Sequence, residues 1–130
     1  MAKFMALLSL LTIVLPSCFS IFGEPETTPI KSLANQNKIK KAVLLQNDGN
    51  ATVDISLSVS ILDYDYTFSG NEIGNAFVVD ENHGRASIDS SSINLIWFGN
   101  DTLQIDYDRR LRKFLQQKKL DGVTIIYKER

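Results

Sequence analysis

The sequence predicts a mainly β domain of about six short, mostly antiparallel strands, arranged as a curled sheet or a small sandwich. Apolar and polar residues alternate over residues 53–61, which is the pattern of a strand with one buried and one exposed face. Two further alternating runs, 93–98 and 103–107, flank Gly99-Asn100-Asp101, as the strands of a β-hairpin flank their turn. Apolar residues follow a helical periodicity only over a short segment, which allows one short helix near residues 109–119.

The other predicted strands follow from the same alternation and from the turn residues between the runs. They are residues 38–46, 75–79 and 123–127. Asn47-Asp48-Gly49-Asn50 supplies the turn after the first of them. In the strand at 53–61, the serines lie on the face opposite to the aliphatic residues, so we expect them to face solvent. Trp97 is expected to be buried in the core.

The N-terminus has the features of an export signal. Lys3 precedes an apolar run at residues 4–15, and this run is shorter than the roughly 20 residues that span a bilayer. The run leads into Leu15-Pro16-Ser17-Cys18, which contains the only cysteine of the chain. We therefore expect residues 1–17 to be a signal peptide.

The stretch that ends in Cys18 resembles the lipobox of bacterial lipoproteins, in which the cysteine becomes the first residue and its thiol is acylated. The resemblance implies that membrane lipid holds the protein through acylated Cys18, with two or three chains that anchor more stably than one. It also implies a position on the periplasmic side or the cell surface, with the outer membrane favoured where one exists. Two alternatives stay open: a secretory signal cut near Ser20 or Gly23, giving a soluble periplasmic or secreted protein, and a retained membrane anchor.

The rest of the chain divides into a tether and one domain. Residues 18–36 are expected to form the lipidated N-terminus and a flexible tether, because residues 23–29 contain two prolines and a glycine. Residues 37–130 are expected to form a single β-rich domain. Since the chain has one cysteine, no intrachain disulfide is possible, and the hydrophobic core alone must hold this domain together.

The charge balance argues against a nucleic-acid partner. Removal of residues 1–17 takes Lys3 from the 14 basic residues and none of the 15 acidic ones, leaving 13 against 15 and a net charge of −2. Nucleic-acid-binding domains normally show a clear basic excess. We therefore expect no nucleic-acid partner.

Several short motifs are similar to those of an uncharacterised family of small bacterial envelope proteins, a domain of unknown function. They are Gly49-Asn50-Ala51-Thr52, Gly74-Asn75-Ala76-Phe77, His83-Gly84, the hairpin at 97–107 and Gly122-Val123-Thr124-Ile125-Ile126-Tyr127. Together they cover residues 38–128. The resemblance implies an exported β-rich domain and supplies no activity, cofactor or site residue.

Two acidic loops contain the candidate ligands of a metal or a glycan. Asp80 and His83, the only histidine, lie in a predicted loop, but a metal site needs three or four ligands that converge. Asp63-Tyr64-Asp65-Tyr66 offers oxygens for calcium and rings for stacking on a sugar, without the glycine and distal glutamate of an EF-hand loop. The alternative for both segments is an ordinary solvent-exposed loop without a ligand.

A basic run near the C-terminus is a candidate surface for anionic lipid or an acidic partner. Its members are Arg109, Arg110, Arg112 and Lys113. A solvated face balanced by Asp106 and Asp108 is the alternative.

The sequence contains no catalytic pattern. Ser90, Ser91 and Ser92 with His83 supply the residue types of a hydrolase, but no Gly-x-Ser-x-Gly motif is present. We therefore expect no catalytic residues and no cofactor, and a non-enzymatic, envelope-anchored domain that binds an envelope protein. The alternatives are an envelope enzyme or small-ligand binding protein that uses the acidic loops, and a purely structural envelope protein.

Overall fold

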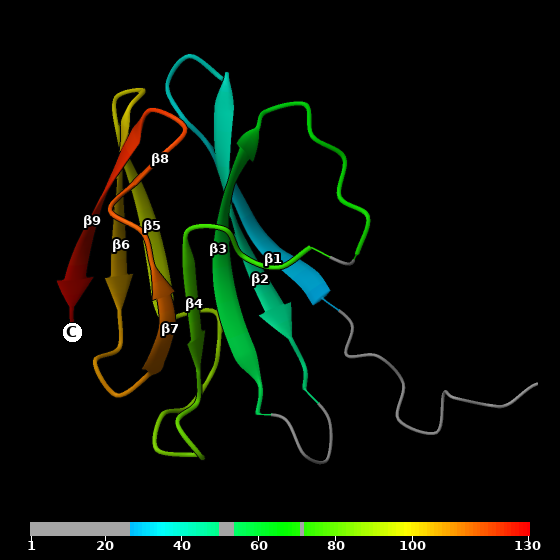
Figure 1. The fold of residues 1–130 in the computed structure, drawn as a ribbon, viewed down its shortest axis with the longest axis vertical. Coiled ribbons are helices and arrows are strands. Elements are labelled where there is room, and N and C mark those ends of the chain that lie inside the picture. Colours follow the sequence, from blue (N-terminus) through cyan, green and yellow to red (C-terminus); the bar gives the residue numbers. More distant parts are fainter. Residues whose placement is uncertain (1–26, 50–53, 71) are drawn as a thin grey trace, which may run out of the picture.

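The computed structural model describes residues 27–49, 54–70 and 72–130, which fold as two β-sheets packed in a sandwich (Figure 1). The strands are β1 (Thr27–Ala34), β2 (Lys40–Asn47), β3 (Ser56–Asp63), β4 (Phe77–Asp80), β5 (Ile93–Phe98), β6 (Thr102–Tyr107), β7 (Arg112–Gln116), β8 (Lys119–Leu120) and β9 (Val123–Glu129). The predicted mainly β, mostly antiparallel sandwich is confirmed. The described ranges contain nine strands rather than about six, and no helix.

The nine strands form a five-stranded sheet and a four-stranded sheet. The five-stranded sheet is antiparallel and has the order β1-β2-β3-β4-β7. The four-stranded sheet has the order β5-β6-β9-β8, and its central pair, β6 and β9, is parallel. The predicted hairpin is β5 and β6, which pair in register from Ile93 opposite Tyr107 to Phe98 opposite Thr102.

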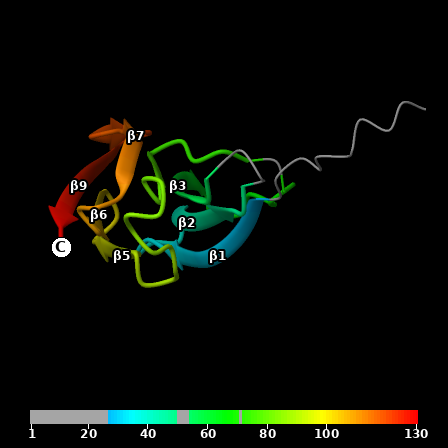
Figure 2. The same cartoon turned by 90° about the horizontal axis from the view of Figure 1, so that it is seen from below.

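The chain crosses from one sheet to the other between β7 and β8. The N–H of Gln117 donates to the carbonyl of Ala76 beside the five-stranded sheet at 2.9 Å, and the N–H of Ile125 on β9 donates to the carbonyl of Lys118 at 2.9 Å. The Tyr127 hydroxyl of β9 also donates to the carbonyl of Gln117. Consecutive residues therefore join both sheets along this side of the sandwich (Figure 2).

On the opposite side, β1 approaches β5 (Figure 2). The indole N–H of Trp97 on β5 donates to the carbonyl of Leu33 on β1 at 2.9 Å. The Asn35 side-chain amide donates to the carbonyl of Asn100, also at 2.9 Å. Trp97 is partly buried against the core rather than fully enclosed, so it both covers the core and connects the two sheets.

The core lies between the inner faces of the two sheets. Its largest buried side chains are Tyr107, Phe77, Leu44, Leu57, Ile61, Ile93, Leu103 and Ile105. The rings of Phe77 and Tyr107 lie 5.1 Å apart between centroids, and those of Phe77 and Tyr127 lie 5.3 Å apart. Aromatic packing at these distances links β4 of one sheet to β6 and β9 of the other.

The expectation that the β3 serines face solvent is wrong for Ser58 and Ser60, whose exposed fractions are 8% and 2%. The loop between β3 and β4 returns across the outer face of the five-stranded sheet and covers them (Figure 1). A Cβ at Gly74 would lie 2.3 Å from Ser58 Cβ, so only glycine allows this approach. The Asn75 side chain then pairs with both the N–H and the carbonyl of Ile61, at 2.8 and 2.9 Å.

Two segments differ from expectation. β1 occupies residues 27–34, so part of the range 18–36 expected to be a tether is a strand, and the sheet begins before residue 37. Its side chains are mostly exposed, and it is held by backbone pairing with β2, so its sequence shows no alternating pattern.

The prediction of a short helix near residues 109–119 is wrong, because β7 and β8 form there. Phe114 forms a bulge in β7, opposite the step from Val78 to Val79. This bulge explains the irregular spacing of the apolar residues.

The predicted signal peptide, Cys18 and the part of the predicted tether up to residue 26 lie outside the described residues. Within the ranges that are described, no helix is long and apolar enough to cross a membrane.

Truncation of Trp97 should weaken the side of the sandwich where β1 meets β5. We expect Trp97→Ala to lower the free energy of unfolding by about 3 kcal/mol, the lower end of the range for a buried aromatic residue, because the indole is only partly buried. Urea denaturation measures this change. Phe98→Ala is the control, since the neighbouring ring is 51% exposed; an unchanged midpoint for Trp97→Ala would contradict the assigned role.

Candidate functional site

A groove crosses the outer face of the five-stranded sheet. It consists of two neighbouring pockets of about 380 and 50 Å³ that share Ser56 and Val78. The larger is also lined by Asp54, Asp80, His83, Arg112 and Phe114, and the smaller by Thr27, Asn47, Ser58, Glu72 and Ile73. The lining residues come from all five strands of the sheet, from β1 to β7. The groove is therefore an elongated surface that runs across the strands.

The larger pocket contains a connected group of charged side chains, which we call the Asp–His–Arg cluster: Asp54, Asp80, His83 and Arg112. Arg112 Nε lies 3.1 and 3.2 Å from the two carboxylate oxygens of Asp80, and its Nη2 also donates to Asp80. Arg112 Nη1 lies 3.2 Å from His83 Nε2. The other ring nitrogen, Nδ1, lies 3.3 Å from an oxygen of Asp54.

Strand pairing and one turn assemble this cluster. Asp80 on β4 is the register partner of Arg112 on β7, so their side chains meet on one face of the sheet. Asn82 and His83 adopt positive φ angles of 51° and 55°, a conformation that costs free energy in residues other than glycine. Two hydrogen bonds from Asn82 stabilise this turn. Its backbone N–H donates to Asp80 Oδ1 at 2.9 Å, and its side-chain amide donates to the carbonyl of Arg110 at 3.2 Å.

The Asp80–Arg112 pair is ionised at neutral pH. Burial of the Asp80 carboxylate opposes ionisation, but the hydrogen bonds from Arg112 and from the N–H of Asn82 outweigh this effect and lower the pKa of Asp80. The hydrogen bond that Arg112 donates to Asp80 also raises the pKa of Arg112. The side chain of Asp80 is only 7% exposed, so this carboxylate forms the floor of the pocket.

An exposed apolar side chain lines each pocket of the groove. The Phe114 ring lies 4.9 Å from the guanidinium carbon of Arg112, a distance typical of a cation–π interaction. Phe114 is 60% exposed, and Ile73, in the smaller pocket, is 80% exposed. The groove thus combines the charged cluster of its larger pocket with one exposed apolar side chain in each pocket.

The geometry favours binding over catalysis at this site. His83 Nε2 lies against the Arg112 guanidinium, so it is not directed at the Ser56 hydroxyl as a general base would be. Arg112 also contacts both oxygens of Asp80, so a cation already occupies the position that a metal ion would need. Among the residues whose placement is described, no three His, Cys, Asp or Glu side chains form a group that could hold a metal ion.

The structure brings Asp80 and His83 together around Arg112, but it separates the four basic residues predicted to face a partner. Arg112 lies in the groove, whereas the Lys113 ammonium lies 3.3 Å from the Tyr107 hydroxyl and 3.5 Å from Glu129, towards the four-stranded sheet. Arg109 and Arg110 line a different pocket. The run in the sequence is therefore not one continuous surface.

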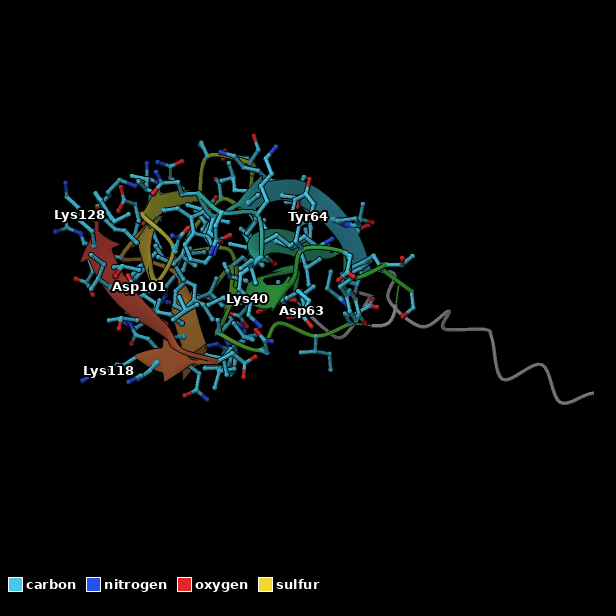
Figure 3. All side chains as sticks on the ribbon, turned by 90° about the horizontal axis from the view of Figure 1, so that it is seen from above. Lys40, Asp63, Tyr64, Asp101, Lys118 and Lys128 are labelled. Atoms are coloured by element: carbon cyan, nitrogen blue, oxygen red, sulfur yellow. The ribbon has the colours of Figure 1, made fainter. Side chains whose placement is uncertain are left out.

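The acidic–aromatic loop after β3 is also divided. Asp63 pairs with Lys40 at 2.7 Å (Figure 3), and the Tyr66 hydroxyl donates to Glu72 at 2.9 Å. Burial acts to raise the pKa of Glu72, but hydrogen bonds from Ser69 and Tyr66 lower it to about 2. This glutamate therefore stabilises the loop as an anion.

Sequence reasoning missed Asp54, Ser56, Val78 and Phe114 in the larger pocket and all the residues that line only the smaller one. The spacing of two between Asp54 and Ser56, and again between Arg112 and Phe114, was the available signal. It could have placed each pair on one face of its strand, but it could not have shown that the two strands share a sheet.

The fold and the groove define an all-β sandwich domain with a charged groove on one outer face. Comparisons with protein-family models, curated proteins and solved structures found no match to this chain. The family suggested by the sequence motifs therefore stays a prediction.

Replacement of Asp80 should give a pH-dependent loss of stability. The folded-state pKa of Asp80 is lowered from its ordinary value of 3.8, so its ionised form stabilises the fold above that pH, and this contribution disappears as the pH falls through the folded-state pKa. We expect Asp80→Asn to lower the free energy of unfolding by about 1–2 kcal/mol at pH 7 and by progressively less below pH 3.8.

Urea denaturation across this pH range measures the effect. Asp63→Asn is the matched control, because the side chain of Asp63 is 69% exposed in its pair with Lys40, and such pairs contribute little. Equal effects of the two substitutions at neutral pH would contradict the role assigned to Asp80.

Proposed function

We propose that this chain is an exported, lipid-anchored and non-enzymatic binding domain, and that its groove binds a segment of another envelope protein. The observation that carries this proposal is the groove itself, with the Asp–His–Arg cluster in its larger pocket and the exposed side chains of Phe114 and Ile73 in the larger and the smaller pocket. Exposed apolar side chains beside fixed polar groups are the composition of protein interaction sites. An elongated groove suits an extended segment better than a compact small molecule.

The bound segment should have a cationic or hydrogen-bond-donating group between apolar residues. The side chains that line the larger pocket include two carboxylates, Asp54 and Asp80, and one guanidinium, Arg112, so carboxylates outnumber guanidinium groups there. Apolar residues of the segment would contact Phe114 and Val78.

The position of β1 supports a location close to the membrane. Eight residues, 19–26, separate Cys18 from the start of β1 at Thr27. Even a fully extended chain of this length spans only about 30 Å. A lipid anchor on Cys18 would therefore hold the groove close to the membrane surface, where the effective concentration of envelope partners is high.

Anchoring is tested by Cys18→Ser in the native host. We expect the parent to sediment with membranes and to be extracted by detergent, whereas the variant is released in soluble form because the acylated thiol is absent. Ser17→Ala, which keeps the thiol and a small residue before it, is the control and should remain in the membrane fraction. Equal membrane partitioning of Cys18→Ser and the parent would rule out the lipid anchor.

Partner binding by the groove is tested with a photo-crosslinking amino acid in cells. We expect adducts from position 73, in the smaller pocket of the groove, and none from position 126, an exposed isoleucine on the four-stranded sheet. Adding Phe114→Ala should reduce the adduct from position 73, because it removes an apolar contact in the larger pocket. Equal adducts from positions 73 and 126, or no effect of Phe114→Ala, would contradict the assignment of the groove.

A further inference from the structure

A second pocket lies at one end of the four-stranded sheet, away from the groove. The strands β6 and β9 finish at this end of the sheet, and β5 begins there (Figure 1). The N–H of Asp108 donates to the carbonyl of Ser92 at 3.1 Å, and the N–H of Arg130 donates to the carbonyl of Tyr107 at 2.9 Å. Backbone hydrogen bonds thus hold together the segments that form the pocket.

This pocket has a volume of about 510 Å³, and three arginines line it. Arg109 and Arg110 come from the turn before β7, and Arg130 follows β9. The hydroxyl-bearing residues Ser87, Ser91 and Ser92 complete much of the wall. Guanidinium groups are donors that proteins use for phosphate-class oxyanions. The hydroxyls of Ser91 and Ser92 already donate to Asp89 and to the carbonyl of Ser87, so the arginines supply the donors.

The two aspartates in the wall are already engaged. Asp89 accepts hydrogen bonds from the N–H and the hydroxyl of Ser91, at 2.7 and 2.5 Å. Asp108 accepts from Nε and Nη2 of Arg110, with a shortest distance of 2.6 Å. The hydrogen bond from Arg110 lowers the pKa of Asp108 to about 2, so this carboxylate holds the guanidinium in place throughout the physiological range.

The arginines retain N–H donors that no described group uses. Arg110 contacts Asp108 through Nε and Nη2, which leaves Nη1. Arg130 donates from Nη2 to the carbonyl of Ser91 at 2.7 Å, which leaves its other N–H groups. Arg109 forms no ion pair with any described residue. The side chains that line the pocket include three guanidinium groups and two carboxylates, so their summed charge is +1.

We infer that this pocket binds a phosphate-class oxyanion, with Arg109, Arg110 and Arg130 as its ligands. Arg110 and Arg130 are each anchored on one side and present their remaining donors on the other, so little side-chain freedom is lost on binding. The oxyanion can come from free phosphate or from the phosphate of an anionic lipid headgroup. This site is independent of the groove, which shares no lining residue with it.

The first experiment is calorimetric titration of the purified full chain with inorganic phosphate at constant ionic strength, with chloride as the reference anion. Arg109→Gln should weaken phosphate binding by at least about tenfold, the loss expected for one charge-assisted contact. Arg130→Lys keeps the charge but removes the planar fork, so it should also weaken binding. Lys31→Gln removes the same charge from the exposed strand β1 and should leave the affinity unchanged.

The second experiment distinguishes the two sources. The full chain with Cys18→Ser is sedimented with phosphatidylcholine vesicles that contain or lack phosphatidylglycerol. Binding that requires phosphatidylglycerol and is lost in Arg109→Gln identifies a headgroup, whereas phosphate binding without vesicle binding identifies a free oxyanion. If neither phosphate nor vesicle binding distinguishes Arg109→Gln from Lys31→Gln, while thermal melts show both variants folded, the inference is overturned.

Discussion

The pairing of β4 with β7 is the interaction on which the rest of this structure depends. It completes the five-stranded sheet, and the next residues of the chain enter the four-stranded sheet. The same pairing places Arg112 beside Asp80 and puts the bulged Phe114 in the larger pocket of the groove. Besides the shared core, the links between the sheets include this crossing and, on the other side, the hydrogen bonds from Trp97 to Leu33 and from Asn35 to Asn100. The β4–β7 pairing therefore both assembles the charged cluster of the groove and leads the chain to its crossing between the two sheets.

The part of the fold that follows from local pattern was predictable. β5, β6 and β9 bury alternate residues, and in β3 the alternate residues Leu57, Val59 and Ile61 belong to the same core, so period-two alternation identified these strands. β1 and β7 lie at the two edges of the five-stranded sheet, and edge strands bury few side chains. β1 exists through backbone pairing with the next strand, β2, and β7 through pairing with β4, which is distant in the sequence. No local pattern of side chains records either pairing.

The buried serines of β3 show a second limit of sequence reasoning. The alternation of residues correctly identified the two faces of the strand. The prediction that the polar face contacts water was wrong. Here the loop after β3 covers Ser58 and Ser60, because Gly74 permits close approach and Asn75 satisfies the backbone of Ile61. The sequence likewise identified Asp80 and His83 together in one loop, and Arg112 in a separate basic run. Only the tertiary pairing of their strands shows that they form one cluster with Asp54.

The parallel pairing of β6 with β9 has a consequence for the order of folding. β9 is an inner strand of the four-stranded sheet, between β6 and β8, yet it is the last strand of the chain. The sheet therefore cannot form its central contacts until the C-terminal residues are available, and pairings between distant segments form slowly. A chain that emerges from a ribosome would therefore keep this sheet incomplete until the residues of β9 (Val123–Glu129) have emerged. The strand order thus makes completion of the four-stranded sheet a late event in synthesis.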